Sequence, residues 1–443
     1  MAESTEGGRG LVAAFHRMRT PWKLTILGIA IAVFLAIRIA SQDEPPGDFV
    51  RYYSAGSFLA DGESERLYEP VKLRRNEHHF HYLPTFACVM APLAMLPLEV
   101  AQGIWLFLHV SSWLICLRIT WLLAGTPGAR ALWMAIPTIF TIRLFVQNLQ
   151  LAQVNPIVMC LTYLGIYAYV KKRDVRAGLL VSLGAAIKFM PVVFLLLFLV
   201  QGRMRAVLGF LAGAVLWVIV VPSIVVGPAR NLELIDQYTE LQGSLVTDSG
   251  TQRVDGQSMK AIWFRFLTPM NSVHQSRHND PIYINVADVD PGVVQWLYIA
   301  SVIAVLAAAA VTARVRNEDW RAPSIQAAVF LAAWLLVSPE SRRAHFMILM
   351  LPYGIVGFSL LRPMFTAGSR LALGGIALAA MLAISVPSRS LVGRKIANLT
   401  DAYANMGFAT LVLGAVLILM LRALASDCQS DPEKTPGSAA PTP

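Results

Sequence analysis

Charge is scarce in this sequence. Only 14% of its 443 residues are charged, whereas 56% are hydrophobic. A soluble core cannot bury so many apolar side chains, so the composition excludes an ordinary soluble domain and predicts a polytopic membrane protein. The formal net charge is +10, but the basic residues lie in short clusters between apolar segments, as the positive-inside rule describes. This pattern argues against nucleic acid as a partner and predicts a lipid bilayer instead.

Cysteine is also scarce, and no pattern points to a metal. The cysteines are scattered, at Cys88, Cys116, Cys160 and Cys428. They predict neither a disulfide framework nor a zinc site. Three histidines lie together in His78-His79-Phe80-His81, but imidazoles so close along one strand or helix do not match a tetrahedral site. We therefore expect no metal and no other cofactor.

Long apolar runs are what the sequence does contain. Runs that are long enough, or nearly so, to span a bilayer occur at 24–40, 100–123, 130–146, 154–170, 176–201, 206–226, 293–314, 324–338, 345–361, 371–387 and 406–424. The short basic loops between them mark the cytoplasmic side, which also holds the N-terminus. The run 24–40 has no convincing small-residue cleavage site and contains Arg38, so it predicts a retained signal anchor.

Two apolar stretches need separate treatment. Basic loops flank the run 176–201 at both ends, so it must enter and leave the membrane on the same side. Lys188-Phe189-Met190-Pro191 is the expected tip, because proline breaks a helix. Two passes of about 13 residues are short, which favours a buried re-entrant pair. The short, proline-bounded stretch 84–97 fits an interfacial helix on the outer side.

The sequence thus predicts an all-α polytopic membrane protein, with about 12 transmembrane helices and interfacial helices in its extracytoplasmic loops. We expect a cytoplasmic segment over 1–23 and a single transmembrane domain over 24–424. A disordered cytoplasmic tail over 425–443 follows from its Pro, Ser, Asp and Glu content. The long extracytoplasmic loops are 41–99 and 227–292.

Most of the unusual polar residues fall on the outer side. Asp48 follows the first apolar run, in an expected turn formed by Gly47, Asp48 and Phe49. A carboxylate at the membrane surface can act as a general base. A solvated loop residue or a helix cap explains its spacing equally well.

Amides and one lysine form a second group of candidates. The amides are Gln147, Asn148, Gln150, Gln153 and Asn155. They can bind sugar hydroxyls, or they can join helices to one another. Lys188 lies within a mostly apolar run, where a charge costs roughly 2.5 to 3.5 kcal/mol. A substrate phosphate would satisfy it, as would snorkelling to lipid headgroups.

Two further stretches carry arginine on the outer side. Arg343 could bind a phosphate bidentately and His345 could donate a hydrogen bond or a proton, although lipid headgroups or Glu340 are alternative partners. In the second long loop, residues 255–258 predict a turn that enters an amphipathic helix, which contains Arg265.

Together these stretches resemble the polyprenyl-phosphate-dependent glycosyltransferases of family 87, in the membrane-embedded GT-C class. The matching stretches are Asp48-Phe49 with Tyr53 and Ala55, residues 62–68, Phe80-x-Tyr82-x-Pro84, Pro92-Leu93-Ala94-x-Leu96-Pro97, Gln153-Val154-Asn155, Ile187-Lys188-x-x-Pro191, Gln257-Ser258 with Arg265, and Ser338-Pro339-x-Ser341 with His345. The sequence departs from the family pattern at 342–344, where an aromatic, a polar residue and a second histidine would be expected.

The resemblance implies a GT-C-like bundle that takes a sugar from a polyprenyl phosphate on the extracytoplasmic side, with Asp48 as the catalytic base. The expected contacts to the donor phosphate or the sugars are Lys188, His345, Arg343, Gln153, Asn155, Tyr53, Gln257 and Arg265. Mannose is the sugar that the resemblance favours, and the acceptor is a glycolipid or a glycan in the cell membrane. A transporter or flippase of lipid-linked sugars is the alternative, but it would place polar residues along a midplane pathway and show internal repeats.

Overall fold

The protein is described by a computed structural model that covers residues 47–73, 76–125, 131–244, 256–273, 280–315, 319, 321–361 and 367–430. The expected N-terminal segment 1–23 and signal anchor 24–40 lie outside the described residues, as does most of the expected tail. The described chain is almost wholly helical, with one antiparallel hairpin that pairs Val71 with His78.

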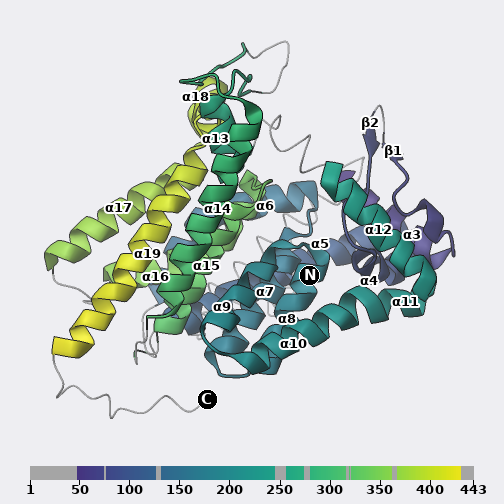
Figure 1. Ribbon diagram of the computed structural model, residues 1–443, viewed down its shortest axis with the longest axis horizontal. Helices are drawn as coiled ribbons and strands as arrows, with labels where there is room; N and C mark the ends of the chain where they lie inside the picture. Colours follow the sequence, from purple (N-terminus) through teal and green to yellow (C-terminus); the bar gives the residue numbers. More distant parts are fainter. Residues whose placement is uncertain are drawn as a thin grey trace, which may run out of the picture.

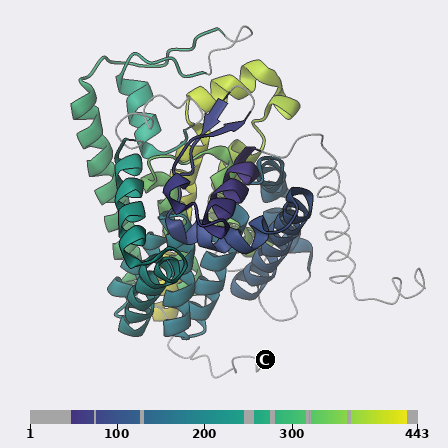
Figure 2. The ribbon, with the colours of Figure 1, turned by 90° about the vertical axis from the view of Figure 1, so that its right-hand side faces the viewer.

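The elements lie along the molecule largely in chain order. In order they are α3 (Gly47–Ala60), η1 (Ser64–Arg66), β1 (Val71–Leu73), β2 (Asn76–His78), α4 (Pro84–Ala94), α5 (Leu98–Ala124), η2 (Ala131–Met134), α6 (Ala135–Leu151), α7 (Asn155–Val170), α8 (Asp174–Ile187), η3 (Met190–Val192), α9 (Val193–Val200), α10 (Met204–Ala214), η4 (Val215–Val220), α11 (Val221–Val226), α12 (Pro228–Ser244), α13 (Met259–Leu267), α14 (Pro291–Ala313), α15 (Ala322–Val337), η6 (Arg343–Leu349), α16 (Met350–Leu361), α17 (Ala367–Ser385), α18 (Arg389–Ala402) and α19 (Asn405–Ser430). Figure 1 shows α3, α4 and the hairpin at one end, α5 to α10 in the middle and α14 to α19 at the other end. Helices α11 and α12 are the exception, because they return to the end that holds α3 and α4. Seen from the first end, in Figure 2, α3 and the hairpin lie in front of the helical bundle.

Four helical stretches among the described residues are long and apolar enough to cross a membrane. They are Leu98–Ala124, Met204–Val226, Pro291–Ala313 and Asn405–Leu424. Five shorter apolar helices accompany them: Pro84–Ala94, Asn155–Val170, Met190–Val200, Ala322–Val337 and Ala372–Ser385. Helices of this length and composition are those of a membrane protein. The expected number of about twelve spans stays a prediction.

The helical run 176–201 breaks where the sequence predicts it. Lys188 has an extended backbone, with φ −144° and ψ 111°, and it separates α8 from η3 and α9. Pro191 lies in the first turn of η3, where its lack of a backbone N–H removes no hydrogen bond from the helix. The predicted break at Lys188 is therefore confirmed.

Close backbone contact joins α8 to α10. A Cβ atom on Gly178 would lie 2.2 Å from the carbonyl oxygen of Ala206, and one on Gly209 would lie 2.6 Å from that of Val175. Small residues at such contacts let two helices approach closely, which is how helices commonly associate in lipid. The break at Lys188 thus follows a helix whose position is fixed by its neighbour.

A π-helical stretch interrupts the helix that contains Met204 to Val226. Over Val215–Val220 the backbone takes a wider turn between α10 and α11. The Thr85 hydroxyl donates a hydrogen bond to the carbonyl of Trp217 at 2.7 Å. The Asn231 side chain donates to the carbonyls of Val218 and Ile219 at 3.1 and 3.2 Å. Both side chains satisfy backbone groups that the widened turn leaves without their usual partners.

Asp48 lies in a helix and not in the turn that the sequence predicts. It occupies the first turn of α3, which ends at Ala60 before Gly62 takes φ +78°. Acidic side chains favour this position because they complement the helix dipole. About two turns further along, a Cβ on Gly56 would lie 2.7 Å from the backbone of Met90, so α3 packs directly on α4.

Candidate functional site

A small hollow lies where α7, the end of α8, α15 and η6 meet. It is lined by Asn155, Val158, Met159, Lys188, Trp334, His345, Met347 and Ile348. The polar lining residues all come from the sequence-predicted set. The remaining walls are apolar, so they exclude water around the polar groups.

Lys188 is the cation of this hollow. Its Nζ donates to Oδ1 of Asn155 at 2.7 Å and lies 2.8 Å from Nε2 of His345. The extended backbone at Lys188 ends α8 and directs the side chain across to α7 and η6. The structure thus brings together three residues that are far apart in the sequence and that the motifs had singled out.

The imidazole of His345 is held by its own loop. The backbone N–H of Arg342 donates to Nδ1 of His345 at 3.2 Å. With Nδ1 accepting, the neutral ring carries its hydrogen on Nε2, which faces Lys188. Nε2 and the Lys188 ammonium are then both donors, so an anion that lies beside the two side chains can accept hydrogen bonds from both.

Amide side chains support Asn155 from behind. Its Nδ2 donates to Oδ1 of Asn148 at 2.8 Å and to Oε1 of Gln153 at 2.7 Å. Asn148 in turn donates to the carbonyls of Leu144 and Ala344, each at 2.8 Å. These bonds leave Oδ1 of Asn155 as the acceptor for Lys188. Of the predicted amide group, Gln150 instead points to the surface.

The sequence reasoning missed two residues of α5 that hold the turn between α6 and α7. Trp105 Nε1 donates to the carbonyl of Ala152 at 2.9 Å, and Nε2 of His109 lies 2.5 Å from the carbonyl of Gln153. Ala152 takes the left-handed conformation, with φ 49°. Trp105 and His109 lie one helical turn apart on α5. A histidine at that spacing from a tryptophan in an apolar run is the sequence feature that could have indicated this contact.

Asp48 does not line the hollow but lies on the neighbouring α3. It forms an ion pair with Arg51, and the two side chains are 16% and 20% exposed. Arg51 also donates to the carbonyl of His79 at 3.4 Å. The carboxylate is therefore reachable from solvent and is held on the helix surface.

Aromatic residues connect α3 to the region of the hollow. The hydroxyls of Tyr52 and Tyr82 lie 3.0 Å apart. Burial raises the pKa of Tyr82, the hydrogen bond with Tyr52 and the charge of Arg51 oppose this, and the carboxylate of Glu340 adds to it. Glu340 also lies within electrostatic reach of Lys188. The rings of Phe49 and Tyr52 on α3 also pack against Trp105, which holds the turn before Asn155.

The structure places the other predicted contacts away from the hollow. Tyr53 donates its hydroxyl to the carbonyl of Leu96 at 2.8 Å. Gln257 and Arg265 are fully buried, and each donates to the backbone carbonyl of Asp401. Arg343 forms an ion pair with the Asp401 side chain. Within the described residues, no group of three or more His, Cys, Asp or Glu side chains gathers as a metal site.

Comparison with known proteins agrees with this arrangement. The family model described as glycosyltransferase family 87 matches residues 80–339. This match runs from the segment before α4 through α15, so it includes Asn155 and Lys188, while Asp48 and His345 lie outside it. No curated protein matches the chain. The matched region is more than half of the sequence and confirms the resemblance found in the motifs. The chain therefore belongs to glycosyltransferase family 87.

Proposed function

We propose that this membrane glycosyltransferase transfers a sugar from a polyprenyl phosphate to a glycolipid or glycan acceptor. Mannose is the sugar that the family resemblance favours. The reaction takes place at the extracytoplasmic face of the cell membrane. The observation that supports this proposal most is the pairing of Lys188 with His345 in one hollow, with Nζ and Nε2 2.8 Å apart. Two nitrogen donors that converge in an apolar setting suit a phosphate group.

The proposed reaction is an inverting displacement. Asp48 takes the proton of an acceptor hydroxyl, whose oxygen forms a bond to the anomeric carbon of the donor sugar. The bond between that carbon and the phosphate oxygen breaks, and polyprenyl phosphate leaves with the electron pair. Lys188 and His345 donate hydrogen bonds to the departing phosphate.

The environment of Asp48 fits the role of a base. Its carboxylate is partly exposed on the surface of α3, where an acceptor hydroxyl can reach it. The phosphate leaving group already carries charge, and two positioned donors can stabilise its departure. We therefore expect the reaction to proceed without a metal.

Purified protein in detergent tests this proposal with polyprenyl-phosphate mannose and a glycolipid acceptor. We expect product in the wild type, and a loss of about 10²- to 10⁴-fold in Asp48→Asn. Asp61→Asn is the matched control, because Asp61 lies exposed just beyond the end of the same helix. Full activity of folded Asp48→Asn would remove the base assignment. Absence of any donor turnover in detergent would favour a transporter, because transport needs two compartments and catalysis does not.

A further inference from the structure

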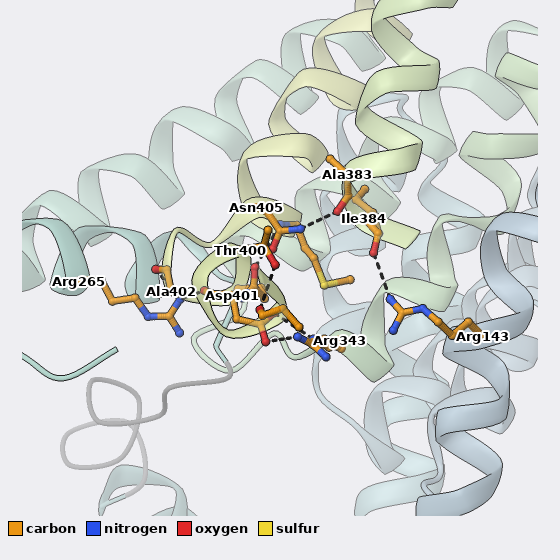
Figure 3. Close-up of polar contacts among 12 residues, drawn as sticks. Arg143, Arg265, Arg343, Ala383, Ile384, Thr400, Asp401, Ala402 and Asn405 are labelled. Carbon is orange, nitrogen blue, oxygen red and sulfur yellow. Dashed lines mark hydrogen bonds and ion pairs between the residues drawn. The ribbon is translucent and has the colours of Figure 1, made fainter. Parts of the chain in front are cut away.

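Asp401 contacts two other segments that are far from it in the chain. Its carboxylate accepts a hydrogen bond from Nε of Arg343 at 3.0 Å and forms an ion pair with the same guanidinium. Its backbone carbonyl accepts from Nη1 of Arg265 at 2.6 Å and from Nε2 of Gln257 at 3.1 Å. Figure 3 shows Arg343 and Arg265 approaching Asp401 and its neighbour from opposite sides.

The segment that contains Gln257 also holds the 338–345 loop directly. The backbone N–H of Gln257 donates to the carbonyl of Ser341 at 2.7 Å, and Gly256 pairs with Arg342 in an isolated antiparallel bridge. The Oε1 atom of Gln257 accepts from the backbone N–H of Met406 at 3.1 Å. The loop is therefore attached both to this segment and to the connection between α18 and α19.

These attachments end next to the imidazole of the proposed site. The residue that pairs with Gly256 is Arg342, and its N–H is the group that binds Nδ1 of His345. Arg343, the partner of Asp401, is the next residue along. A shift of this loop would change the direction in which Nε2 of His345 points.

The geometry favours a structural role for Arg343 over a direct contact to phosphate. Asp401 engages both Nε and Nη2 of the guanidinium, and the two side chains are 17% and 18% exposed. If Arg343 left this pair to bind a phosphate, the carboxylate of Asp401 would stay unpaired and would repel the arriving anion. Arg343 also does not line the hollow.

We propose that Asp401 and Arg343 are positioning residues, whose ion pair fixes the 338–345 loop so that His345 faces Lys188. This inference rests on the proposed function for its catalytic consequence. Asp401 lies outside the residues that the family model matches, and Arg343 lies in the stretch where the sequence departs from the family pattern.

Steady-state kinetics with varied donor test the catalytic consequence. We expect Arg343→Gln and Asp401→Asn each to lower kcat by about 10- to 100-fold, since a small misplacement of a reacting group has effects of this size. The double variant should lose no more than either single variant, because both remove one interaction. The donor KM should stay within about threefold of the wild type. Arg394→Gln, on the exposed surface of α18, is the control and should be neutral.

A conservative pair separates charge from geometry. Arg343→Lys keeps the charge but loses the two-pronged contact, so it should lose activity, and adding Asp401→Glu should recover much of it. A rise of more than about tenfold in donor KM for Arg343→Gln, with Asp401→Asn unchanged, would show direct phosphate binding and overturn the proposal.

A second readout does not depend on transferase activity. Diethyl pyrocarbonate modifies neutral imidazole, and mass spectrometry reports the rate at His345 in substrate-free protein. Arg343→Gln, Asp401→Asn and the less disruptive Arg343→Lys should each speed this modification severalfold, with thermal unfolding confirming that each variant is folded. Unchanged rates would overturn the positioning role. Faster modification combined with no transferase activity in the wild type would instead uphold this role and refute the proposed function.

Discussion

Replacing Lys188 with methionine is the sharpest test of the hollow. Methionine has nearly the same length as lysine but carries neither the charge nor the hydrogen-bond donors. The substitution removes the 2.7 Å bond to Asn155 and the 2.8 Å contact with His345. The amide groups that hold Asn155 from behind stay in place.

The expected magnitudes separate catalysis from folding. Losing one donor to a developing anion costs about 10²- to 10³-fold in kcat, or roughly 3 to 4 kcal/mol. For folding, the hydrogen bond from the ammonium to Asn155 contributes about 1.5 to 3 kcal/mol, whereas removing a lysine from an apolar setting returns about 2.5 to 3.5 kcal/mol. These effects largely offset each other, so we expect stability to change by no more than about 2 kcal/mol in either direction.

The assay is transfer from polyprenyl-phosphate mannose in detergent, paired with a thermal unfolding scan of each purified protein. Lys395→Met is the matched control, because Lys395 lies exposed on α18 and its loss removes the same charge. We expect Lys188→Met to unfold as one species and to lose transfer, while Lys395→Met keeps both. Transfer by Lys188→Met within about threefold of the wild type would refute the role of this lysine.

Three further outcomes are expected. Gly178→Ala should lower the unfolding temperature and the yield of monodisperse protein, because its Cβ would lie 2.2 Å from the Ala206 carbonyl oxygen. Gly103→Ala is the control and should change neither, because a Cβ there meets no atom within 4 Å. Equal behaviour of the two variants would contradict the contact between α8 and α10. Asn155→Ala should lower kcat by about 10-fold or more, since it frees Lys188 from its acceptor, and an unchanged rate would show that the amide does not orient the lysine. Addition of a chelator should leave transfer unchanged, whereas strong inhibition that added metal reverses would refute the metal-free mechanism.

Local chemistry made much of the site predictable from the sequence. A lysine in an apolar run requires a partner, and a proline three residues later requires a helix break, so Lys188 could be assigned to a turn with a polar contact. The structure supplies Asn155 and His345 as the partners. The apolar runs also gave most helices within a few residues, as in α5, expected over 100–123 and found over Leu98–Ala124.

Tertiary contacts account for what the sequence could not predict. Arg343 was expected to meet phosphate, but Asp401 binds it from 58 residues further along the chain, and no local pattern indicates such a pairing. The left-handed turn at Ala152 decides which amides point inward, and that conformation is uncommon for alanine. The run 345–361 was expected as one helix, yet it begins as a tighter helix over Arg343–Leu349, where the loop is held by its neighbours.

The π-helical stretch Val215–Val220 sets the direction in which the chain leaves its helix. Removing one residue there would restore ordinary α-helix geometry and close the wider turn whose carbonyls accept hydrogen bonds from Thr85 and Asn231. The segment that follows includes α12, whose Gln242 donates to the carbonyl of His81 at 3.2 Å. A single-residue deletion in the π-helical stretch would therefore weaken the attachment of α4, through Thr85, and of α12, through Asn231, to this helix. In this part of the chain the number of residues matters more than their identity, and substitutions should be tolerated where deletions are not.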